Sequence, residues 1–185
     1  MKKVLFLFCF IGFISITSSF GQGFYSTPYK DRNSGSFSKD ASLLSIQYGI
    51  GHLSTWNFLG YGSGVTLGPV YVKYEKGIMD ELGIAAYVAP SFTRYKHHDN
   101  VLSFGTGALA YYHFNKLIPL ADLDVSAGAG LGLKFHNNAN HDTKVRGGMI
   151  FKVNARYYFS NSFGVHLETG WDYMSALQAG ITLRF

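Results

Sequence analysis

Apolar and polar residues alternate strictly along the segment from Asp122 to His136. The apolar row comprises Leu123, Val125, Ala127, Ala129, Leu131, Leu133 and Phe135. A period of two is typical of a β-strand. Strands of soluble sheets usually run about five to six residues, and this segment is far longer. Its length and alternation match a tilted strand of about 9 to 11 residues that crosses a membrane within a β-barrel.

The same alternation recurs from Ala41 to the end of the chain and predicts about eight strands. The expected strands span Ser42–Gly51, Thr66–Glu75, Leu82–Arg94, Leu102–Phe114, Asp122–His136, Gly148–Phe159, Phe163–Tyr173 and Leu177–Phe185. The outward rows are apolar, whereas the inward rows hold nearly all of the strand charges. A soluble β-sandwich or lipocalin-like barrel, the alternative, would show the opposite distribution. The pattern therefore predicts an all-β fold, a single eight-stranded antiparallel transmembrane up-and-down β-barrel.

Aromatic residues gather near the ends of these strands, where aromatic belts mark the two interfaces of membrane barrels. The residues expected in such girdles include Trp171, Tyr173, Phe159, Phe163 and Phe185. Pro69 and Pro90 interrupt two neighbouring strands near their extracellular ends. Because proline removes a ladder hydrogen bond, we expect a bulge at the rim there.

The first 22 residues predict a cleaved secretory signal peptide. Met1, Lys2 and Lys3 precede an apolar run over 4–16, which is shorter than the roughly 20 residues of a membrane helix. Residues 23–41 are rich in polar residues without periodicity and predict a flexible periplasmic tail. The barrel is expected over 42–185. Cys9, the single cysteine, lies within the signal, so the mature chain should carry no thiol.

Composition supports a membrane barrel, since 15% of residues are charged, 17% are aromatic and 22 are glycine. Without Lys2 and Lys3, the 16 basic residues fall to 14 against 11 acidic ones. This bias is too weak to indicate a nucleic-acid partner. We expect no cofactor and a monomeric protein.

The signal sequence, the alternation from Leu43 onward and the terminal strand Gly180–Phe185 with its final aromatic residue resemble the small bacterial outer-membrane β-barrels of the OmpX and OmpA type. The resemblance implies a location in the cell outer membrane with both termini periplasmic. It also implies contacts with outer-membrane lipids and recognition of the terminal strand by the barrel-assembly machinery. It names no function or extracellular ligand, because this fold hosts adhesins, lipases and structural proteins.

Charged residues of the inward rows are expected to pair within the lumen, because buried charges must be paired. A tight turn over 160–162 would place Arg156 opposite His166 and Asn154 opposite Glu168. A turn over 174–176 would place Arg184 opposite His166 and Glu168 opposite Thr182. The expected ion-pair cluster comprises Glu168, Arg156, Arg184, Lys152 and His166. We interpret it as a plug of paired charges, with a proton or ion path as the alternative.

Three functions fit this chain, and a non-enzymatic barrel with a structural or loop-mediated binding role ranks first. An outer-membrane lipid-modifying hydrolase is the second, and a narrow carrier for small apolar molecules is the third. Hydrolysis needs a nucleophile and a base within hydrogen-bond reach. The candidates are Ser103 or Ser175 with His97, His98 or His141, and Asp99 or Asp142 as the acid. His97, His98, His136 and His141 are also weak candidates for a metal site, and no metal is expected because adjacent loop histidines are weak evidence.

Overall fold

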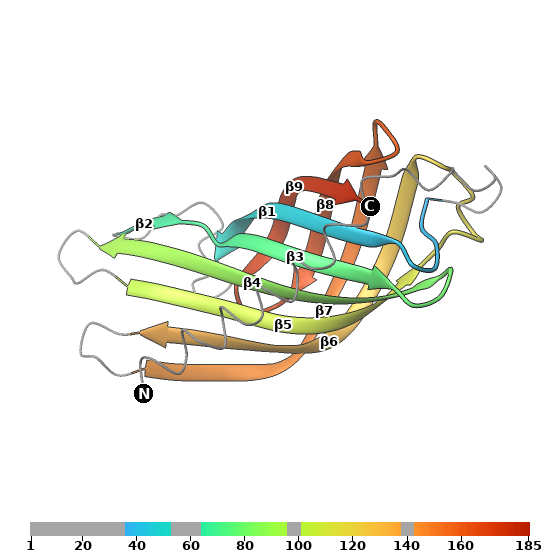
Figure 1. The fold of residues 1–185 in the computed structure, drawn as a ribbon. Coiled ribbons are helices and arrows are strands. Elements are labelled where there is room, and N and C mark those ends of the chain that lie inside the picture. Colours follow the sequence, from blue (N-terminus) through green and yellow to red (C-terminus); the bar gives the residue numbers. More distant parts are fainter. Residues whose placement is uncertain (1–35, 53–63, 96–100, 138–142) are drawn as a thin grey trace. The chain divides into compact units, whose positions relative to one another are not determined.

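The computed structural model describes residues 36–52, 64–95, 101–137 and 143–185 (Figure 1). Its strands are β1 (Ser42–His52), β2 (Gly64–Leu67), β3 (Val70–Gly77), β4 (Leu82–Tyr95), β5 (Val101–His113), β6 (Leu123–Asn137), β7 (Thr143–Tyr158), β8 (Phe163–Trp171) and β9 (Ser175–Arg184). Within these ranges, no helix is long and apolar enough to cross a membrane. Residues 1–35, with the predicted signal peptide, lie outside the described part of the chain.

Antiparallel pairing closes the sheet into a ring. β1 pairs with β3 on one side and with β9 on the other, and the strands from β3 to β9 each pair with the next strand along the chain. β2 continues the line of β3 and also pairs with β4, so β2 and β3 together form one of eight strands. The predicted eight-stranded antiparallel up-and-down barrel is confirmed. Through its middle, where the described strands pair on both sides, the ring has no edge strand.

A β-bulge separates β2 from β3. Val72 pairs with Val88 and Leu67 with Phe92, so five residue steps on one strand face four on the other. The extra residue is accommodated at Gly68, whose φ of 89° is a conformation that favours glycine. Pro69 follows directly, and Pro90 on β4 lies opposite the break, as expected from their missing N–H groups.

β7 begins five residues before the predicted start at Gly148, because residues 143–147 pair with the end of β6. These residues are exposed and do not alternate. The last pair between β7 and β8 joins Phe151 to Trp171, so the start of β7 has a described neighbour on one side only. Because this segment has one described neighbour, neither of its faces is buried. Its sequence therefore shows no alternation of apolar and polar residues from which the strand could be predicted.

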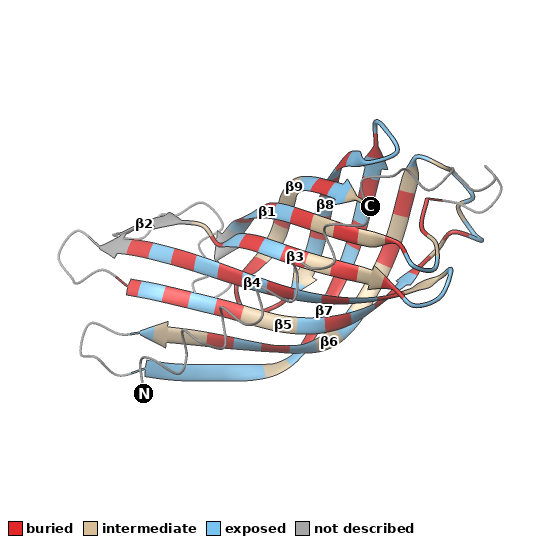
Figure 2. Ribbon diagram, in the orientation of Figure 1, coloured by how far each residue is buried: buried red, intermediate tan, exposed pale blue. Residues whose placement is uncertain are grey.

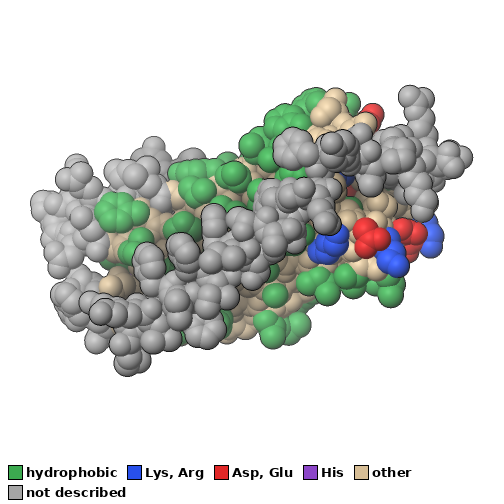
Figure 3. Space-filling model, viewed as in Figure 1, with side chains coloured by type: hydrophobic (Ala, Val, Ile, Leu, Met, Phe, Trp, Pro, Cys, Tyr) green, Lys and Arg blue, Asp and Glu red, His purple; other side chains and the backbone are tan. Residues whose placement is uncertain are grey.

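The barrel carries its apolar side chains outside and its charged side chains inside. Figure 2 shows buried and exposed residues alternating along the strands, and the exposed positions include Leu131 at 67% and Leu167 at 52%. The inward positions bury Lys73, Glu75 and Arg156 to 2% exposure or less. Figure 3 shows hydrophobic side chains over the visible outer wall. This distribution is the one expected of a barrel in lipid.

Residues 36–41, the end of the segment predicted as a flexible tail, pack into the mouth of the barrel where β1 begins and β9 ends, here called the turn mouth. The Phe37 ring is 2% exposed and stacks on the His113 ring with a centroid distance of 3.5 Å. The Asn115 side-chain amide donates to the Phe37 carbonyl at 2.8 Å. A single inserted aromatic side chain produces no sequence period, so the alternation could not predict this cap.

The exterior position Leu131 tests the lipid-facing wall. Replacing Leu131 by arginine should lower the free energy of unfolding in lipid vesicles by about 2 to 4 kcal/mol, because a cation would face hydrocarbon near the middle of β6. Leu131→Val keeps the site apolar and serves as the control. Urea unfolding in vesicles measures both variants, and equal stabilities would contradict a lipid-facing position.

Candidate functional site in the barrel lumen

Arg156 is buried in the lumen on the side of the turn mouth, where its guanidinium binds two carboxylates. Its Nη1 donates to Asp124 at 2.9 Å, and its Nη2 pairs with Glu75. The His113 ring joins the same two acids, with Nδ1 2.7 Å from Asp124 and Nε2 2.8 Å from Glu75. Each ring nitrogen of His113 therefore faces a carboxylate oxygen, an arrangement that matches the two N–H donors of an imidazolium. We call these four residues the lower cluster.

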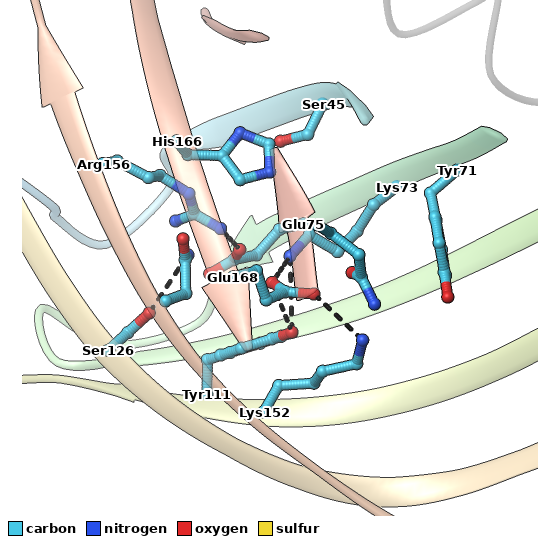
Figure 4. Close-up of polar contacts among 12 residues, drawn as sticks. Ser45, Tyr71, Lys73, Glu75, Tyr111, Ser126, Lys152, Arg156, His166 and Glu168 are labelled. Atoms are coloured by element: carbon cyan, nitrogen blue, oxygen red, sulfur yellow. Dashed lines mark hydrogen bonds and ion pairs between the residues drawn. The ribbon is translucent and has the colours of Figure 1, made fainter. Parts of the chain in front are cut away.

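A second cluster lies on the loop side of the first and is drawn in part in Figure 4. Glu168 on β8 pairs with Lys73 on β3 and lies 3.6 Å from the Lys152 ammonium. Lys152 also pairs with Asp172 at 2.8 Å. We call these four residues the upper cluster. The Tyr111 hydroxyl donates to Glu168 at 3.1 Å and thus adds a neutral donor to the pair.

The two clusters are balanced in charge. The cations Lys73, His113, Lys152 and Arg156 face the carboxylates Glu75, Asp124, Glu168 and Asp172. All eight side chains are 2% exposed or less. Buried ions lose their hydration, and only close pairing with good geometry offsets that loss. The lumen therefore holds an ion network that is neutral as a whole.

Inward glycines leave the room that this network needs. A Cβ on Gly128 would lie 2.6 Å from the Tyr111 ring, and a Cβ on Gly83 would lie 2.7 Å from a carboxylate oxygen of Glu75. The interior of an eight-stranded barrel is just wide enough to be filled by side chains. The Tyr111 and Glu75 side chains thus lie over glycines of the neighbouring strands.

An apolar layer packs beside the network and continues past it on the loop side. It comprises Tyr71, Ala85, Tyr87, Ala89, Leu109, Tyr111, Ile150 and Met174, with Tyr173 packed against it. The connection between β8 and β9 turns inward to supply Met174, because Asp172 Oδ1 accepts hydrogen bonds from the backbone N–H groups of Met174 at 2.8 Å and Ser175 at 2.9 Å. Asp172 thus belongs to the ion network and also fixes the turn.

The register between β7 and β8 is as predicted, since Arg156 pairs with His166 and Asn154 with Glu168. The register between β8 and β9 is different from the one expected. His166 pairs with Gly180 instead of Arg184, and Glu168 pairs with Gln178 instead of Thr182. The turn begins at Asp172 and β9 starts at Ser175, earlier than the alternation indicated.

This shift removes Arg184 from the expected cluster. Its guanidinium lies at the turn mouth, where Nη1 donates to the Ser36 carbonyl at 2.6 Å and the group stacks over the Tyr158 ring. Glu168 and Lys152 do meet, whereas His166 Nδ1 lies 2.8 Å from the Thr182 hydroxyl. Arg156 is in the lumen but pairs with acids of the lower cluster.

Sequence reasoning missed five members of the network. These are Lys73, Glu75, His113, Asp124 and Asp172. They occupy the inward rows, so the alternation showed that they share the lumen. Lys73 and Glu75 pair with residues of strands that are not their neighbours in the sheet, and pairing across a lumen has no counterpart in sequence spacing. Asp124 and Asp172 instead pair with Arg156 and Lys152 of the neighbouring strand β7, and the missing signal there was the register.

The girdle residues divide between the two faces of the wall. Phe159, Phe163 and Trp171 are exposed on the outside, and the rings of Phe159 and Phe163 stack with centroids 6.4 Å apart. Tyr173 instead packs against the apolar layer of the lumen, with a φ of 67° in the turn. Phe185 is the residue that follows β9.

A serine and a histidine meet near the other mouth, here called the loop mouth, where β4 joins β5 and β6 joins β7. A hydrogen bond of 2.8 Å links Ser103 Oγ and His136 Nδ1. Ser175 instead contacts the Tyr71 hydroxyl at 2.8 Å. The other hydrolase and metal candidates, His97, His98, Asp99, His141 and Asp142, lie outside the described residues. In the described ranges, no group of three His, Cys, Asp or Glu residues could hold a metal ion.

Comparisons with known proteins agree with this architecture. No protein-family model matches the chain, and no curated protein matches its sequence. Among solved structures, it is similar to the outer membrane protein OprG from Pseudomonas aeruginosa, with a TM-score of 0.56, 9% identity, and coverage of 82% of this chain and 98% of that one. It is also similar to the N-terminal β-barrel domain of Pseudomonas aeruginosa OprF, with a TM-score of 0.50, 15% identity, and coverage of 80% and 98%. The chain therefore has the fold of the small outer-membrane β-barrels.

Glu168 is the sharpest probe of the ion network. Glu168→Ala should lower the free energy of unfolding by about 3 to 5 kcal/mol, because Lys73 loses its carboxylate and remains buried. Glu81→Ala is the control, since Glu81 pairs with exposed Lys116 at a turn and its loss should change stability little. Urea unfolding in vesicles compares the two variants. A loss for Glu168→Ala no larger than that for Glu81→Ala would contradict a buried network.

Proposed function

We propose that this chain is an integral outer-membrane β-barrel whose lumen is closed by its own side chains, with a structural role or a binding role of its extracellular loops. The observation that carries the proposal is the inverted distribution of polarity. Apolar residues such as Leu131 and Leu167 are exposed on the wall, while the charges are buried and balanced inside. In water such a surface would be unfavourable, and in lipid it is the stable arrangement.

Closure at two levels supports a barrel without an open channel. At the turn mouth, Phe37 covers His113 and Arg184 holds the Ser36 carbonyl. Towards the loop mouth, Met174 is fully buried in the apolar layer. The ion network fills the space between these levels. A solute would have to displace paired charges to pass.

The proposed orientation puts both termini in the periplasm and the loop mouth outside the cell. The outer wall would then contact outer-membrane lipids, and the barrel-assembly machinery would recognise the terminal strand. The protein would be a monomer, since the ring is complete within one chain. The extracellular loops would be the parts that meet other molecules.

Lipid hydrolysis is a second candidate because Ser103 and His136 are within hydrogen-bond distance. A nucleophile paired with a base is the starting arrangement of acyl transfer. Ser103 is, however, 3% exposed and faces inward, whereas Leu102 and Phe104 beside it face outward. An acyl chain in the membrane would meet the outward residues. A carrier for apolar molecules ranks third, since Met174 and Ile150 occupy the space that a carried molecule would need.

The closed barrel makes a direct prediction for transport. The protein should fractionate with outer membranes, migrate differently on a gel before and after boiling, and show no stable open conductance in a planar bilayer. The filled lumen is the physical reason. A steady large conductance of the wild-type protein would contradict the plug, and recovery in the soluble periplasmic fraction would contradict the membrane barrel.

Catalysis can be separated from a non-enzymatic role with outer-membrane lipids in detergent. We expect the purified protein to release no fatty acid, because Ser103 faces the lumen instead of lipid. Mass spectrometry of the lipids measures release, with Ser103→Ala as the matched variant. Fatty acid released by the wild type and not by Ser103→Ala would make hydrolysis the better assignment.

A further inference from the structure

Lys134 is a buried cation that the ion network does not use. It lies on β6 towards the loop mouth and is 5% exposed. Its Nζ donates to the Tyr173 carbonyl at 3.2 Å, and no described carboxylate lies within ion-pair distance. An ammonium has three donors, so two of them have no described acceptor. A buried charge ordinarily requires a counter-charge.

Asp172 is the described acid that acts on Lys134, but it does so from beyond ion-pair distance. Asp172 is the carboxylate of the upper cluster nearest the loop mouth, and it already pairs with Lys152 at 2.8 Å and accepts from the Tyr71 hydroxyl at 2.6 Å. The four carboxylates of the network are matched by its four cations. Lys134 is therefore in excess of a balanced set.

Further positive charge lies beside Lys134. Arg146 is its register partner on β7, and Lys144 is the register partner of His136. The described ends of β4 to β7 at the loop mouth, residues 88–95, 101–106, 131–137 and 143–150, contain no aspartate or glutamate. The described strand ends at the loop mouth therefore combine buried Lys134 with the exposed cations Lys144 and Arg146 and carry no acid.

Hydroxyl groups line the same wall. Ser91 on β4 pairs in register with Ser103 on β5, and Ser103 pairs with His136 on β6. Ser91 is 3% exposed, and its Oγ has no hydrogen-bond partner within the described structure. Residues opposite one another on an antiparallel pair have Cβ atoms about 4.5 to 5.5 Å apart. The two hydroxyls therefore lie side by side, one inward position beyond Lys134.

We propose that the loop mouth holds an oxyanion site that takes a phosphate group. Lys134 supplies the buried charge, exposed Arg146 supplies the second charge, and the Ser91 hydroxyl supplies a neutral hydrogen bond. The Ser103 hydroxyl supplies another when the imidazole Nδ1–H of His136 donates in the bond that joins these two residues. A phosphate monoester carries about 1.5 to 2 negative charges near neutral pH and three strong acceptor oxygens. Two cations and two hydroxyls match that charge and that number of acceptors better than they match a carboxylate.

The phosphate could belong to a free ion or to a lipid headgroup in the outer leaflet, and the chemistry of recognition is the same. The site goes beyond the proposed structural or binding role, because it assigns a ligand class to the loop mouth. Its failure would leave the closed membrane barrel untouched, since the wall and the ion network do not depend on Lys134.

Titration calorimetry of the refolded full chain in maltoside micelles, with inorganic phosphate as the probe, tests the site. Lys134→Gln should weaken binding by about tenfold or more, because a charge-assisted hydrogen bond is lost. Lys116→Gln is the matched control, since Lys116 is an exposed lysine at a turn of the opposite mouth, and it should bind as the wild type does. Equal weakening by both variants would overturn the proposal as non-specific charge attraction.

Two further arms make the result decisive. Phosphatidic acid in the same micelles, compared with diacylglycerol, distinguishes a lipid phosphate from the free ion, and binding of either phosphate that depends on Lys134 supports the site. If the protein binds neither phosphate, the proposal is overturned.

Ser91→Ala and Arg146→Gln provide a second test of phosphate binding if Lys134→Gln does not fold. Phosphate binding that is unchanged in both variants would also overturn the proposed site. Altered gel migration on boiling checks the fold of each variant.

Discussion

The pairing of buried charges across the lumen is the interaction on which the rest of this structure depends. Lipid on the outside leaves no place for charged side chains on the wall, so the inward rows must hold them. Once inside, they lie far from water and must neutralise one another. Four cations and four carboxylates do so, and His113 reaches the required charge because its ring lies between Glu75 and Asp124.

The same network organises both ends of the barrel. His113 presents its ring face to Phe37, so the lower cluster forms the seat for the cap at the turn mouth. Asp172 pairs with Lys152 and also accepts hydrogen bonds from the backbone of the β8–β9 turn, which directs Met174 into the lumen. The plug and its two covers are therefore one connected set of contacts and not three independent features.

The two halves of the lumen differ in their balance of positive and negative charge. In the half near the turn mouth, the charges of Arg156 and His113 are balanced by Glu75 and Asp124 of the same chain. The half near the loop mouth has Lys134 and Arg146 without a described acid beside them. We therefore expect the loop mouth, where positive charge is in excess, to contact other molecules. We expect the half near the turn mouth, where the charges are balanced, to be the rigid part of the barrel. This division suits a barrel whose wall anchors it and whose loop mouth meets the surroundings.

The alternation of residues by itself determined the strand number, the antiparallel order and the face on which each side chain lies, because a period of two follows directly from strand geometry. It also predicted the β7–β8 register, since the alternation on both strands stops on either side of residues 160–162, where the turn lies. Only the tertiary structure decided the β8–β9 register, because Asp172 closes that turn earlier than the pattern shows. It also decided the pairing of Lys73 with Glu168 and of Arg156 with Glu75, and the insertion of Phe37. These contacts join residues across a closed ring, and a one-dimensional pattern states which face a residue occupies but not which residue faces it on the far wall.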